Sequence, residues 1–173
     1  MDSLLKYTDE TDKSLGIAGM AISLIACDSE DYLASVSLEE GEEAIAMASE
    51  FFFNGNPSVS AKIAWNEMLK QYQITTAMLI GNIMCRALVA GHSPKTKILD
   101  LVHDIVKREG AAQCSLEDDE IENVYRKNFS YYNRLFKHPA VQDIARDFAT
   151  TLRMARRMTA GEVVENLHRL NSL

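Results

Sequence analysis

Residues that break helices are scarce in this sequence of 173 amino acids. It contains three prolines and eight glycines, whereas alanine, leucine, methionine, glutamate, lysine and arginine are plentiful. The β-branched and aromatic residues do not alternate with polar residues in runs bounded by turns, so no segment is predicted to be a β-strand. Because the abundant residues favour helix, we expect an all-α protein without a sheet.

Cysteine is also rare, and its spacing excludes two kinds of small fold. Cys27, Cys85 and Cys114 are odd in number, lie far apart and form no Cys-x-x-Cys pair. This spacing excludes a zinc finger and argues against a disulfide scaffold. A reducing cytoplasm is the simplest compartment for three such thiols.

Basic residues are fewer than acidic ones, 18 against 25, which gives a formal net charge of −7. The excess lies in residues 1–56, which hold twelve acids and only two lysines. An acidic protein repels nucleic acid and anionic membranes over most of its surface, so neither is an expected partner. We expect the acidic residues 1–56 to attract the more basic remainder, within one chain or between copies.

The spacing of apolar residues predicts one domain over residues 1–173, a six- or seven-helix antiparallel bundle. Its longest helix is expected at about 58–90, and because the second half is apolar on almost every side, this helix should lie at the centre. Capping boxes beginning at Ser37, Ser115 and Thr159 mark other helix starts. The remaining helices are predicted at about 11–27, 37–53, 93–109, 115–136, 139–158 and from 160 onward.

The first predicted helix carries two further signals. Gly16, Gly19 and Ser23 are small residues spaced so that another helix can approach closely. Its end, Leu24-Ile25-Ala26-Cys27, resembles the lipobox of bacterial lipoproteins, which would imply a lipid-anchored exported domain attached through Cys27. Since residues 1–13 lack the positive charge of a signal peptide, we favour a buried helix and no membrane attachment.

Two acid-x-x-His motifs are the candidate metal ligands. Asp100 with His103 and Glu165 with His168 resemble the Glu-x-x-His motifs of ferritin-like di-iron bundles, and the resemblance implies a metal-binding helical bundle. The first motif has Asp in place of Glu. At about 100° per residue both pairs lie opposite the apolar stripes of their helices, so we expect them to face water. The favoured interpretation has no metal and no cofactor.

Basic residues gather at two places in the second half of the chain. The stretch from Tyr125 to His138 interleaves cations with aromatic residues, as single-stranded nucleic-acid sites do. The aromatic residues fall on one helical stripe, however, which predicts that they are buried. The second group is a candidate surface for an anion or an acidic partner, namely Arg146, Arg153, Arg156 and Arg157.

Arg86 is the only charged residue between Lys70 and Lys95, and it lies on the helix that we expect at the centre. A buried guanidinium must be paired, so we expect a carboxylate from another helix, with Asn82 one turn away as a further contact. A ligand site at Arg86 and Asn82 is the alternative.

No catalytic residue is predicted, because the sequence contains no glycine-rich phosphate loop and no Gly-x-Ser-x-Gly motif. The leading hypothesis is a non-enzymatic interaction or regulatory protein that binds a protein partner or a second copy of itself. The ferritin-like metal-binding bundle and the lipid-anchored domain are the alternatives.

Overall fold

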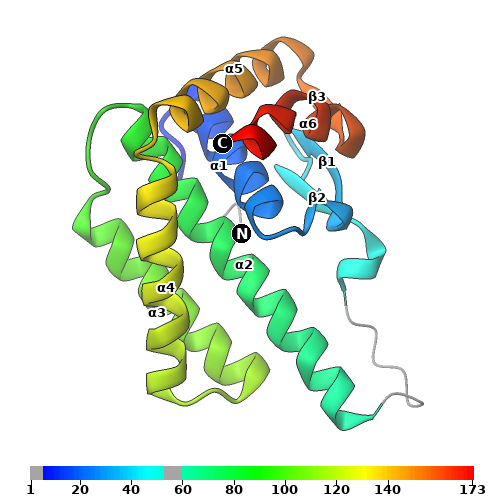
Figure 1. Cartoon of the computed structure of the whole chain (residues 1–173), viewed down its shortest axis with the longest axis vertical. Helices are drawn as coiled ribbons and strands as arrows, with labels where there is room; N and C mark the ends of the chain where they lie inside the picture. Colours follow the sequence, from blue (N-terminus) through cyan, green and yellow to red (C-terminus); the bar gives the residue numbers. More distant parts are fainter. Residues whose placement is uncertain (1–5, 53–59) are drawn as a thin grey trace.

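Six helices and a small antiparallel sheet share one hydrophobic core in the computed structural model, which describes residues 6–52 and 60–173. The predominantly helical fold is confirmed (Figure 1). The helices are α1 (Glu10–Ala26), α2 (Ala61–Val89), α3 (Thr96–Cys114), α4 (Asp118–Leu135), α5 (Pro139–Ala155) and α6 (Ala160–Leu167). The strands are β1 (Leu33–Ser37), β2 (Ile45–Met47) and β3 (Arg157–Thr159).

The longest helix, α2, lies at the centre of the bundle, as its apolar second half predicts. It packs against α1, α3, α4 and α5 (Figure 1). Almost every side chain from Ile74 to Val89 is buried. Its first turns are less covered, and Ile63 and Trp65 remain 54% and 43% exposed. The predicted range of 58–90 agrees with the observed helix within the described residues.

The small residues of α1 permit a close crossing with α2. A Cβ atom on Gly19 would lie 2.6 Å from the Cβ of Cys85, and one on Gly81 would lie 2.8 Å from the carbonyl oxygen of Gly19. Both distances are shorter than any van der Waals contact, so neither glycine can carry a side chain without moving the backbone. The predicted close approach of a second helix to α1 is therefore confirmed.

The helix predicted over 37–53 is wrong, as is the prediction that the protein has no sheet. Instead β1 pairs antiparallel with β2 and with β3, so that Val36 lies opposite both Ile45 and Met158. The residues between β1 and β2 include four glutamates and Gly41, which has a φ of +81°. Like charges three and four residues apart destabilise a helix, whereas a glycine with positive φ favours a turn. Residues 53–59 lie outside the described part.

Two helix boundaries also differ from prediction. We expected Gly110 to follow the end of a helix, but α3 continues through it to Cys114, with the Tyr72 ring packed where a side chain would be. Ser115 then adopts a left-handed conformation, with a φ of 52°, and ends α3 instead of starting α4. The true N-cap of α4 is Glu117. The capping box at Thr159, in contrast, is present at the start of α6.

Candidate functional site

The two acid-x-x-His motifs lie on different helices, and their side chains do not converge on a shared metal site. Nε2 of His103 on α3 lies 2.7 Å from the carboxylate of Glu122 on α4, while Nδ1 of His168 contacts the backbone oxygen of Glu165 in its own turn. Asp100, Glu165 and His168 are exposed, and His103 is partly covered. Among the described residues, no group of three or more histidine, cysteine, aspartate or glutamate side chains is close enough to hold a metal ion.

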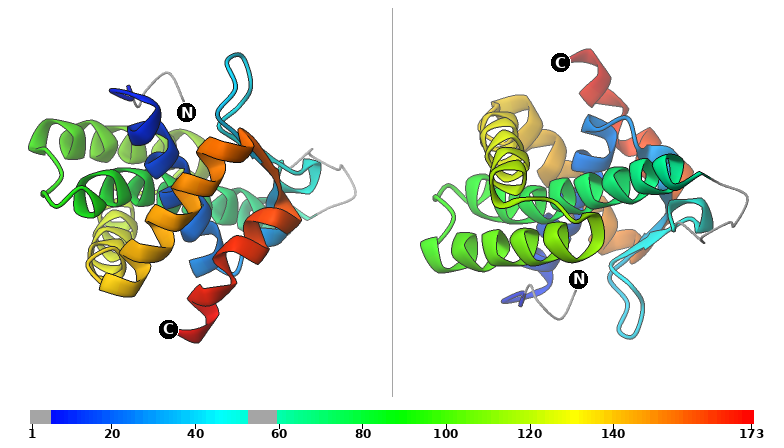
Figure 2. Two further views of the ribbon diagram at one scale, coloured as in Figure 1. Left: turned by 90° about the horizontal axis from the view of Figure 1, so that it is seen from above. Right: turned by 90° about the horizontal axis from the view of Figure 1, so that it is seen from below.

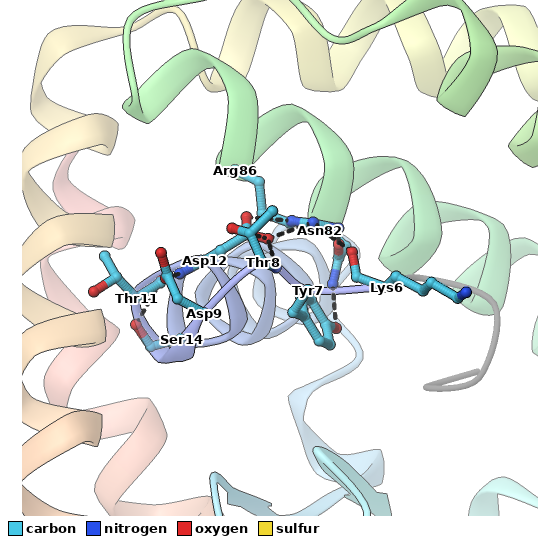
Figure 3. Close-up of polar contacts among 9 residues, drawn as sticks. All are labelled: Lys6, Tyr7, Thr8, Asp9, Thr11, Asp12, Ser14, Asn82 and Arg86. Atoms are coloured by element: carbon cyan, nitrogen blue, oxygen red, sulfur yellow. Dashed lines mark hydrogen bonds and ion pairs between the residues drawn. The ribbon is translucent and has the colours of Figure 1, made fainter.

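Arg86 joins α2 to the segment that enters α1. Its guanidinium makes two hydrogen bonds of 2.6 Å to the carboxylate of Asp12. It also donates to the backbone oxygen of Lys6 and to the side chain of Asn82, and it lies over the ring of Tyr7 (Figure 3). The carboxylate from another helix, which the sequence leads us to expect, is thus Asp12, and four of the five guanidinium N–H groups are engaged.

The carboxyl group of Asp12 is held ionised by this arrangement. Burial alone would raise the pKa of Asp12, but hydrogen bonds from Arg86 and Thr8 and the charge of Arg86 outweigh it, so that the pKa lies below 3.8. A cleft of ≈390 Å³ adjoins the pair. Because Arg86 and Asp12 neutralise each other and tie α2 to α1, we assign the pair a structural role.

Arg156 and Arg157 contact acidic residues from the first 56 of the same chain. The predicted helix over 139–158 ends early, at Ala155, because Arg156 has a φ of 66° and turns the chain into β3. Its guanidinium then reaches Glu10 at 2.6 Å and Glu39 at 3.0 Å, and Arg157 reaches Glu42 at 3.4 Å. The two ends of the chain therefore attract each other internally, which is one of the two arrangements expected from the charge distribution.

Arg146 and Arg153 on α5 are engaged as well. Arg146 bonds to Asp143 at 2.9 Å and to the backbone oxygen of Val89 at 3.2 Å. Arg153 donates to the hydroxyl of Ser14 on α1, at 2.9 Å. The arginine group predicted as an anion or partner surface thus mainly fastens α5 and β3 to neighbouring elements.

A group of exposed cations without side-chain partners among the described residues lies instead on α4 and at its end. The aromatic stripe of this helix faces inward as predicted, since Tyr132 and Phe136 are fully buried and Tyr125 and Phe129 partly buried. The opposite side of α4 carries three exposed cations, which at about 100° per residue lie within about 100° of one another around the helix axis, and Lys137 is exposed just beyond the end of the helix. We call this side the α4 basic face, and it comprises Arg126, Lys127, Arg134 and Lys137.

Within residues 6–52 and 60–173, no side chain forms a hydrogen bond or ion pair with these four cations. Residues 123–142 contain no acid. The acids of α4 lie in its first turns, before the cations, and two of them are paired elsewhere, Glu122 with His103 and Asp118 with Lys107. Ser130 lies exposed near its middle, and Tyr131 beside it is 41% exposed. Sequence reasoning located these cations but assigned them only as residues off the aromatic stripe. The run of twenty residues without an acid was the signal that could have identified the face.

Cys27 lies at the end of α1, close to α4. Its sulfur is 3.1 Å from the hydroxyl of Tyr132. Burial is the main reason that its thiol pKa is raised. Cleavage before Cys27 would remove α1, whose residues from Ile17 to Leu24 belong to the core. The lipobox alternative is therefore difficult to reconcile with this fold.

Comparison with protein-family models, with curated proteins and with solved structures found no match to this chain. No helix in the described ranges combines the length and the apolar character needed to cross a bilayer.

Proposed function

We propose that this chain is a non-enzymatic, cytoplasmic interaction module that binds an acidic segment of a protein through the α4 basic face. One observation carries the proposal. Seven of the nine arginines bond to side chains or backbone oxygens of the chain, and the two that do not, in the part that the structure describes, are Arg126 and Arg134. Both lie on the α4 basic face.

An arginine without a partner is suited to recognition of carboxylates. The guanidinium presents planar donors that match a carboxylate in bidentate geometry. Lys127 and Lys137 add charge to the same face, and charge complementarity of this kind speeds encounter and selects partners. Tyr131 supplies an aromatic side chain next to the cations, and tyrosine and arginine are both enriched at protein interfaces. The expected partner surface is acidic with an apolar neighbour.

A protein partner is favoured over nucleic acid for two reasons. Binding to single strands depends on several exposed aromatic rings, whereas the stripe from Tyr125 to Phe136 packs inward. In addition, a chain with a net charge of −7 repels a phosphate backbone over most of its surface. A short acidic protein segment avoids that repulsion because it needs to approach only α4.

A photo-crosslinking amino acid at position 130, in the middle of the α4 basic face, tests the proposal in cells. The matched control carries the same group at position 111, which is exposed on α3. We expect position 130 to capture an acidic protein segment, and Arg126→Glu with Arg134→Glu to abolish the capture. The double variant Lys62→Glu with Lys97→Glu, with the same change in net charge outside α4, should retain it. Equal capture at 111, or capture unaffected by the arginine reversals, would overturn the proposal.

A further inference from the structure

This chain itself contains an exposed acidic segment, in the loop between β1 and β2. The loop between β1 and β2 contains Glu39, Glu40, Glu42 and Glu43 around Gly41. Two of the four form ion pairs within the chain, Glu39 with Arg156 and Glu42 with Arg157. The other two, Glu40 and Glu43, are exposed, and no cation of the described residues forms an ion pair with them.

The loop is held outward, in a position where another molecule can reach it. A Cβ atom on Gly41, at the tip, would meet nothing within 4 Å. The contacts of Arg156 with Glu39 and of Arg157 with Glu42 hold the loop on both sides of Gly41, which limits the conformational entropy that ordering of Glu40 and Glu43 would cost on binding. Glu40 and Glu43 are therefore exposed on a loop that ion pairs hold in place.

Within one molecule the loop cannot reach the α4 basic face. In both views of Figure 2 the hairpin loop projects from one side of the molecule and α4 lies on the opposite side. The same holds in Figure 1, where the sheet and α4 flank α2 on different sides. Among the described residues, the unpaired acids of the loop and the unpaired cations of the α4 basic face lie on opposite sides of the molecule. This arrangement allows a head-to-tail contact between copies.

We infer that the β1–β2 loop of one copy binds the α4 basic face of a second copy, with Glu40 and Glu43 opposite Arg126 and Arg134. This inference rests on the proposed function and names its partner. A head-to-tail contact uses two different surfaces, so it leaves one of each free at the ends of a dimer. The assembly therefore extends beyond dimers as the concentration rises. Because its charges are exposed, salt weakens it.

Two charge-reversed variants test the pairing of these surfaces. The first carries Arg126→Glu and Arg134→Glu, and the second carries Glu40→Lys and Glu43→Lys. In either variant alone positions 40 and 43 carry charges of the same sign as positions 126 and 134, whereas in an equimolar mixture these positions of one variant meet opposite charges on the other. Light scattering after size exclusion, at protein concentrations up to about 1 mM and low ionic strength, reports the mass. Circular dichroism melting curves check that both variants fold.

The wild-type chain should exceed its monomer mass of 19.4 kDa at low salt and return to it at about 1 M salt, where screening is nearly complete. Each variant alone should stay monomeric, and the mixture should associate. The variant Lys62→Glu with Lys97→Glu should behave as the wild type does. A monomeric wild type, or a mixture no heavier than its components, overturns the inference.

Crosslinking from position 130 separates failure of this inference from failure of the proposed function. If the wild type is monomeric and position 130 captures a different acidic protein, the second copy is the wrong partner and the proposed function stands. If position 130 captures neither, both fail. Capture of residues 38–44 of a second copy supports both.

Discussion

Replacement of Asp12 by asparagine should lower the free energy of unfolding by about 2–3 kcal/mol at neutral pH. Asp12 and Arg86 are only 19% and 12% exposed, so solvent screens their interaction weakly. Asparagine keeps one acceptor oxygen for the guanidinium and loses the other. A hydrogen bond to a charged group contributes about 1.5–3 kcal/mol, and the loss of the ion pair adds to it because Arg86 keeps its charge in a mostly buried position.

Urea unfolding of the wild type, Asp12→Asn, Arg86→Met and the double variant measures this effect. The double variant should be more stable than the sum of the two single losses implies, because removal of both partners leaves no unpaired charge. In thermal melts the loss in Asp12→Asn corresponds to roughly 4–12 °C for a chain of this size.

The difference between wild type and Asp12→Asn should depend on pH. The pKa of Asp12 is below 3.8 in the folded chain, so the carboxyl group binds a proton less readily there than in the unfolded chain. A group with a lowered folded pKa contributes its full stability above the unfolded value and loses it as the pH falls through the folded value. The two proteins should therefore converge below about pH 4. Equal stability at pH 7, or a difference that stays constant on acidification, would refute this reasoning.

Three further predictions concern the core, the thiols and the histidines. Gly19→Ala should cost about 3 kcal/mol in chemical unfolding, the upper end for overpacking, because the obstacle is the Gly81 backbone; a loss under about 0.5 kcal/mol would show that the helices can separate freely. Cys27 should be the only thiol that a disulfide reagent modifies in the folded protein, slowly because burial raises its pKa, and a second thiol reacting at the same rate would contradict the fold. His103→Gln with His168→Gln should leave the metal content of the purified protein, by elemental analysis, as low as that of the wild type, and a stoichiometric metal lost in this variant would restore the ferritin-like alternative.

The central helix and the close α1–α2 crossing were predictable because they depend on local patterns. A helix that is apolar on all sides requires packing neighbours on all sides. Small residues at helical spacing indicate that a second helix approaches closely. The burial of residues 74–89 and the close packing at the glycines of α1 therefore follow from the sequence pattern alone.

The sheet was not predictable because its stability comes from residues that are distant in sequence. Val36 in β1 is fully buried and pairs with Met158, which is more than 100 residues away in the sequence. Ser37 and Glu40 satisfy a capping-box pattern, but Ser37 accepts a hydrogen bond from the backbone N–H of Glu39 in a turn instead. Strand pairs of three to five residues leave little periodic signal for a local pattern to detect.

The candidate surface was only partly predictable for a similar reason. The cations of α5 and of α4 look equally free in the sequence, and which group has partners is decided by long-range folding. Arg156 finds Glu10 and Glu39 because its positive φ turns the chain toward α1 and the sheet. In the part of the chain that the structure describes, no acidic side chain forms an ion pair with the cations on the outer side of α4.

Amide chemical-shift mapping of the labelled protein, titrated with the partner captured from position 130 or with unlabelled wild type, tests the interface most directly. The account predicts that the perturbed amides of the labelled chain include a continuous set over residues 126–137, and that these shifts vanish at high salt. Shifts centred on α5 or on the cleft beside Arg86, with α4 unchanged, would contradict it.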